Sequence, residues 1–187
     1  MGIQVREKTL EEIEDKLLEM TTSLNKINYL ESVLKESGFS FEIKRFLWEK
    51  LSEFLEEQGM YGRAAKALSN KASVEFSFKE RIDNHLYAAE LYSKVGKLDD
   101  ADEMFVRALR DGNNEQRLKI KLARKNIYLS FAKSLEEKGK NASAARFYEK
   151  IIKMNLEDIE KKEIKKKLIS TYNSLGLFRE ARLLEGV

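Results

Sequence analysis

The chain has 187 residues and a formal net charge of +3; 36% of its residues are charged and 42% are hydrophobic. It has no cysteine, which excludes disulfides and thiol chemistry, and no proline, which favours long uninterrupted helices. No run approaches the ~18 apolar residues of a membrane span, and the acidic start lacks the features of a secretory signal. We therefore expect a cytoplasmic protein of about one domain. The richness in Lys and Glu is also typical of thermophilic proteins, although an AT-rich genome gives the same bias.

The first forty residues predict two helices that stand outside the pattern of the rest. Residues 1–8 precede the first helix, and Thr9-Leu10-Glu11-Glu12 is a capping-box pattern that opens a helix ending near Met20. A second helix is expected over about 23–37, before Gly38. Because a stack of helical hairpins needs a terminal unit, we interpret residues 1–40 as an N-terminal capping hairpin.

Four glycines mark a register that repeats along the remaining chain. They are Gly59, Gly96, Gly139 and Gly176, spaced 37, 43 and 37 residues apart. Five residues later come Ala64, Ala101, Ala144 and Ala181. Four residues earlier come Leu55, Tyr92, Leu135 and Tyr172. Glycine can end a helix in the left-handed conformation, the preceding apolar residue lies on one face of that helix, and the alanine lets the next helix approach closely.

This register predicts hairpins over about 41–73, 79–110, 115–155 and 157–186. Residues 73–78 alternate in polarity as a strand would, but the chain offers no partner strand, so a linker or a helix start is favoured. We expect an all-α fold, an α-solenoid or right-handed superhelix of antiparallel helical hairpins with about ten helices. Residues 41–187 would form one continuous domain of four hairpins.

The pattern resembles the tetratricopeptide repeat, which places a large aromatic, Leu, a small residue and Tyr on one helix, then Ala and Phe on the next. The second copy carries Tyr92, Gly96, Ala101 and Phe105, and the first copy supplies the family's tryptophan as Trp48. The resemblance covers roughly residues 42–187. The spacing exceeds the family's usual ~34 residues and the closing proline is absent. Longer helices or linkers would account for both, as in vesicle-fusion adaptors of the soluble NSF attachment type.

The resemblance implies that the first helix of each hairpin lines a concave groove that binds peptides. It maps the groove face onto Phe46, Glu49, Glu53, Glu56, Asp83, Leu86, Glu90, Leu129 and Lys133. Residues 1–60 carry a net charge of −5 and residues 61–187 one of +8, so the N-terminal half of the groove would be acidic. The clamp with which chaperone-binding members hold acidic tails is absent apart from Asn126. The expected ligand is a basic or amphipathic segment of another protein.

Two basic stretches support an alternative function. Arg117, Lys121, Arg124 and Lys125 stand on one predicted helix, and residues 161–167 hold a second group of lysines. Such stretches are commonly solvated helix faces balanced by nearby glutamates. They also suit phosphate contacts in a helical repeat protein associated with nucleic acid, which is the less favoured partner.

No residues converge on a chemical reaction. His85 and Trp48 fall in the aromatic column of their repeats, where packing is favoured, with a partner contact as an alternative for His85. Gly59-Met60-Tyr61-Gly62 lacks the lysine and Ser/Thr of a phosphate-binding loop. We therefore expect a non-enzymatic interaction scaffold or adaptor without catalytic residues, cofactor or metal, and without insertion into a membrane. The short last helix leaves the C-terminal hairpin without a polar cap, which suggests a homo-oligomer through that end.

Overall fold

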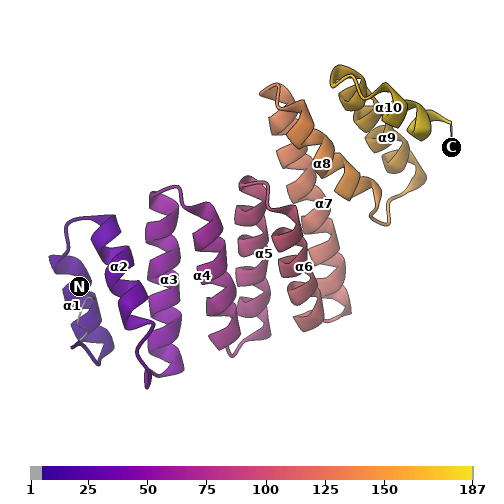
Figure 1. Ribbon diagram of the computed structural model, residues 1–187. Coiled ribbons are helices and arrows are strands. Elements are labelled where there is room, and N and C mark those ends of the chain that lie inside the picture. The colour runs from indigo at the N-terminus through magenta and orange to yellow at the C-terminus, as the bar shows by residue number, and fades with distance from the viewer. Residues whose placement is uncertain (1–5, 187) are drawn as a thin grey trace. The chain divides into compact units, whose positions relative to one another are not determined.

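The computed structural model describes residues 6–186 and consists of helices and their connections in this range (Figure 1). The helices are α1 (Leu10–Glu19), α2 (Ser23–Val33), α3 (Phe41–Glu57), α4 (Tyr61–Val74), α5 (Phe78–Lys94), α6 (Leu98–Asp111), α7 (Asn114–Glu137), α8 (Asn141–Ile152), α9 (Asp158–Ser174) and α10 (Phe178–Glu185). The predictions of an all-α fold and about ten helices are confirmed. Residues 75–77 are non-helical and α5 begins at Phe78, as the linker prediction required. Of residues 1–8, which were expected to precede the first helix, residues 1–5 lie outside the described range.

Hydroxyl side chains start the early helices. The Glu12 N–H donates to the Thr9 hydroxyl at 3.3 Å, and the Thr9 N–H donates to the Glu12 carboxylate at 3.1 Å. This is the predicted capping box of α1. Ser40 and Ser77 cap α3 and α5 in the same way, each accepting a backbone N–H from three residues ahead. Caps of this kind stabilise a helix by about 1 kcal/mol each, and here they fix where the hairpins begin.

Each repeat glycine ends its helix in the left-handed conformation, with φ of 69° at Gly59, 72° at Gly96, 68° at Gly139 and 73° at Gly176. The residue after each glycine donates its N–H to the carbonyl of the apolar residue that stands four positions before the glycine. The four bonds are Met60 to Leu55 (2.8 Å), Lys97 to Tyr92 (3.0 Å), Lys140 to Leu135 (2.8 Å) and Leu177 to Tyr172 (2.9 Å). This bond is the mark of a Schellman motif. The repeated glycine and the repeated apolar residue four positions before it therefore belong to the same turn.

The helices form two compact units, Met1–Arg117 and Leu118–Val187, with the division inside α7. In the first unit α2 packs on α3, and α3 to α6 pack on one another in sequence order. In the second unit α8 packs on α9 and α9 packs on α10. The alanines that follow the repeat glycines are all buried, none more than 2% exposed, so a small residue sits wherever the two helices of a hairpin approach closely. They are Ala64, Ala101, Ala144 and Ala181.

Glu136 joins three helices of the second unit. Its carboxylate accepts hydrogen bonds from the Tyr148 hydroxyl at 2.6 Å and from the Thr171 hydroxyl at 3.3 Å. The Lys167 ammonium lies 3.8 Å from the same carboxylate. Burial, together with the bond to Glu136, raises the pKa of Tyr148. These contacts connect α7, α8 and α9 through polar groups as well as through their apolar core.

Among residues 6–186, no helix combines the length and the apolar character needed to cross a bilayer. The same range brings no three His, Asp or Glu side chains together in a group that could hold a metal ion.

We expect Gly96→Ala to lower the free energy of unfolding by about 1 kcal/mol or more, because an L residue is strained at positive φ. An added Cβ there meets nothing within 4 Å, so the loss would come from the backbone alone. Gly62→Ala is the matched control: Gly62 lies inside α4, and its Cβ would meet Val95 Cγ2 at 3.8 Å, an ordinary contact. The free energy of unfolding of that variant should rise by about 0.5 kcal/mol. Urea denaturation measures both changes, and equal losses would contradict the role given to Gly96.

Candidate protein-binding surfaces

The outer side of α3 is acidic. Glu49 and Glu53 are exposed, and Phe46 and Glu56 are half-buried. Their spacing of three or four residues places them along one side of the helix, away from the side that buries Leu51. The predicted groove residues of this helix therefore do lie on one accessible face.

One side-chain hydrogen bond joins the accessible sides of α3 and α5. The Tyr87 hydroxyl donates a hydrogen bond to the Glu56 carboxylate at 2.6 Å, and this bond, with burial, raises the pKa of Tyr87 to about 12. Asp83 and Glu90 are exposed on the same helix, and Leu86 is half-buried. We call the surface made by Glu49, Glu53, Glu56, Asp83 and Glu90 the acidic face.

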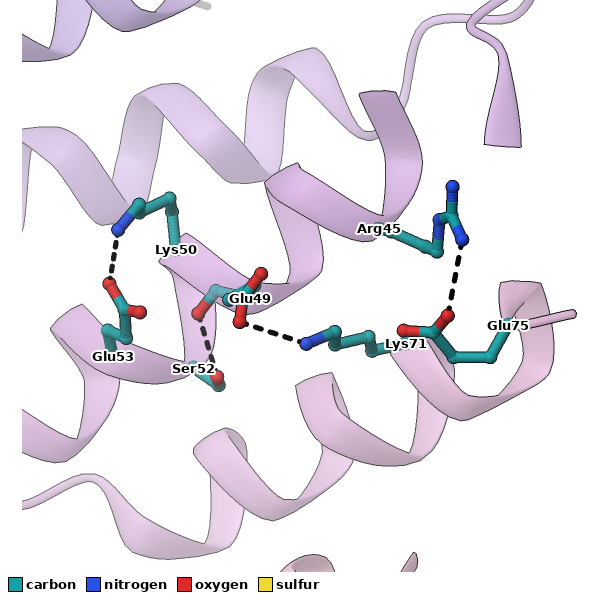
Figure 2. A network of polar contacts seen from close by, with 7 residues as sticks. All are labelled: Arg45, Glu49, Lys50, Ser52, Glu53, Lys71 and Glu75. Atoms are coloured by element: carbon teal, nitrogen blue, oxygen red, sulfur yellow. Dashed lines mark hydrogen bonds and ion pairs between the residues drawn. The ribbon is translucent and has the colours of Figure 1, made fainter. Parts of the chain in front are cut away.

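Carboxylates outnumber cations around Lys50. Its ammonium lies 2.8 Å from Glu53, as Figure 2 shows. The hydrogen bond to Glu53 raises the pKa of Lys50, and so do the negative charges of Glu53, Glu49 and Glu14. Glu14 belongs to α1, so carboxylates of two helices act on Lys50. One lysine shared by several carboxylates leaves the acidic face with an excess of negative charge.

Two ion pairs connect α3 with α4 and with Glu75, the residue that follows α4 (Figure 2). Lys71 lies 3.0 Å from Glu49, and Arg45 lies 3.4 Å from Glu75. The side chain of Glu75 is 5% exposed, and its burial raises its pKa despite the arginine. Glu49 thus has a structural partner on α4, whereas its remaining exposure still adds to the acidic face.

Two predicted groove residues belong to the second unit, 118–187. Leu129 is half-buried and Lys133 is exposed on α7. Their participation in one groove with α3 and α5 stays a prediction.

The residues of the first basic stretch divide between exposed and engaged side chains. Arg117 is exposed and donates from Nε to the Leu109 carbonyl at 3.0 Å, and Lys121 is exposed. Lys125 forms an ion pair with Glu160 of α9, and the Arg124 guanidinium lies 5.8 Å from the Tyr128 ring centre. Part of the positive charge expected to contact nucleic acid is therefore engaged in contacts within the protein.

A cavity of about 410 Å³ lies between α2, α3 and α4, and the sequence did not predict it. Apolar side chains and a rim of charged or polar groups line it. They are Glu31, Leu34, Lys35, Trp48, Leu51, Leu55, Arg63, Lys66, Ala67 and Asn70. Trp48, expected in the core, is half-buried and forms part of this wall. The sequence signal for this cavity is the basic character of Lys35, Arg63 and Lys66 around apolar positions. The repeat register does not reveal it, because α2 lies outside that register.

An ion pair and a buried histidine lie where α5 packs on α6. Arg81 donates to Asp111 at 3.0 Å, and the Asp111 side chain is 5% exposed. His85 beside them is 4% exposed, and its Nδ1 has no hydrogen-bond partner within residues 6–186. Burial lowers the pKa of His85 to about 4; the Asp111 charge opposes this shift, while Arg107, Arg81 and Arg110 add to it. This neutral, enclosed imidazole is a packing residue, as the first of the two alternatives for His85 held.

No family model matches the chain, and no curated protein matches it. The crystal structure of BtubC (BKLC) from P. vanneervenii aligns over 94% of this chain and 76% of that chain, with 13% sequence identity and a TM-score of 0.37. A match at that level identifies neither a family nor a function. The likeness to tetratricopeptide repeats stays an expectation from the sequence.

Acid pH should lower the stability of the folded protein through His85. The folded-state pKa of about 4 lies below the ordinary value of 6.5, so the unfolded chain takes up the proton first as pH falls. Stability is therefore unaffected by His85 above pH 6.5 and decreases between pH 6.5 and about 4, by up to about 3 kcal/mol.

The variant His85→Leu should flatten this part of the stability curve, which denaturant titrations at a series of pH values would measure. The difference between the two proteins isolates His85 from carboxylates that titrate in the same range, Asp111 included. Parallel curves for the two proteins would show that His85 takes up protons equally in both states.

Proposed function

We propose that this protein is a non-enzymatic scaffold that binds a basic segment of another protein along the acidic face. The observation that carries the proposal is the hydrogen bond from Tyr87 to Glu56, which brings the outer sides of α3 and α5 together. The exposed carboxylates of α3 and α5 would then contact one polypeptide segment together.

The charge around Lys50 supports a cationic partner. Glu53 and Glu49 remain about half-exposed in spite of their ion pairs, with side-chain exposures of 48% and 49%. Exposed pairs such as that of Lys50 with Glu53 contribute only about 0.2–1 kcal/mol, so a lysine or arginine from a partner can replace Lys50 at little cost. Complementary charge then orients the segment and speeds its association.

Apolar contacts would supply the affinity that exposed charges cannot. Phe46 and Leu86 are half-buried, and part of each side chain remains accessible beside the carboxylates. A basic segment with apolar residues on one side would cover them, which favours an amphipathic ligand over a purely charged one.

The buried state of His85 supports a role without catalysis. The protein's one histidine is 4% exposed and held neutral, so it does not reach a substrate. The proposed activity is therefore the positioning of partners.

The test is capture of proteins from nuclease-treated lysate, followed by cross-linking and mass spectrometry to locate the bound segments. We expect basic segments cross-linked near α3 and α5, and a loss of at least tenfold in capture when Glu49, Glu53 and Glu90 are all changed to lysine. The matched control changes Glu157, Glu163 and Glu185 of the second unit, all exposed, to lysine and should retain capture.

The proposal fails if the acidic-face variant captures the same segments as the wild type, or if the recovered segments are acidic. Capture that vanishes with nuclease would instead favour the basic stretches and a nucleic-acid partner.

A further inference from the structure

We propose that the cavity between α2, α3 and α4 is a second docking site, which binds an acidic segment of a partner protein through two apolar side chains. This inference does not depend on the acidic face. It uses the other side of α3, which presents Leu51 and Leu55 where the acidic face presents Glu49 and Glu53.

The cavity has the dimensions and the lining of a binding site. Its volume of about 410 Å³ falls within the ~300–1,000 Å³ of typical ligand sites. Leu34, Trp48, Leu51, Leu55 and Ala67 form its apolar part. Contributions from α2, α3 and α4 make it a gap between hairpins that a side chain can fill without moving the backbone.

A second hollow of about 230 Å³ adjoins the cavity. Leu34 and Trp48 line both, so the two depressions share part of one apolar wall. Phe39 and Leu47 line the smaller one. Two depressions that share part of one wall suit two side chains of a single polypeptide segment, which is why we infer a peptide ligand rather than one small molecule.

The charge around these depressions selects an acidic segment. At the rim, Arg63 is paired with Glu31 at 2.6 Å. Lys35 and Lys66 are exposed and form no ion pair within residues 6–186. Lys44 and Glu36 both line the smaller hollow, so the excess of positive charge around the two depressions comes from Lys35 and Lys66. Carboxylates placed beside the two apolar anchors would meet these ammonium groups, so the site recognises a charge opposite to that favoured by the acidic face.

The experiment selects binders from a random library of twelve-residue peptides displayed on phage, using the full chain as bait. Selection on the wild type is followed by comparison with Lys35→Glu/Lys66→Glu, in which two exposed lysines are reversed. The control Lys138→Glu/Lys153→Glu makes the same change at exposed positions of the second unit. We expect enrichment of acidic peptides with two bulky apolar residues, and a loss of affinity of roughly tenfold or more in the rim variant only.

Trp48 reports occupancy directly because it is the only tryptophan in the chain. Selected peptides, resynthesised without tryptophan, should shift its fluorescence to shorter wavelength as they cover the half-buried indole. A library that yields no acidic class overturns the proposal, as does binding that ignores the rim reversal or leaves the Trp48 emission unchanged. A response to decanoate in the absence of any selected peptide would assign the cavity to a fatty acid and also overturn it.

Discussion

The close approach of two helices at each glycine turn is the constraint on which the rest of this structure depends. The left-handed glycine reverses the chain, and the next residue bonds back to the carbonyl of the apolar residue five positions before it, which is four before the glycine. The alanine five residues on then fits between the helices without exposed surface. Larger side chains at that position would separate the hairpin and open the apolar contacts that each helix makes with its neighbours.

The sequence was sufficient to predict the helices and their turns because these depend on local rules. The capping box at Thr9, the glycine turns and the helix start at Phe78 each involve residues within one or two turns of each other. The outward position of Glu49 and Glu53 also followed from helical periodicity.

Contacts between residues far apart in the sequence were beyond that reasoning. The bond between Glu56 and Tyr87 spans 31 positions, and the pairs of Arg45 with Glu75 and Arg81 with Asp111 each span 30. The cavity beside Trp48 depends on how α2 meets α3 and α4, and α2 has no register to compare with the repeats. Side-chain packing between hairpins decides such features, so the positions of the helices alone do not reveal them.

Because the helices pack on their sequence neighbours, the folding of this molecule depends mainly on contacts between residues close in the sequence. Contacts such as those of α3 with α4 and α5 with α6 close short loops, and short loops cost little chain entropy. Low contact order of this type is associated with fast folding, and arrays of similar units gain stability one interface at a time. A division of the chain into two compact units adds a natural boundary for cooperativity. A single melting temperature is then an incomplete description of the molecule, because each hairpin contributes its own share to a sequence of local equilibria.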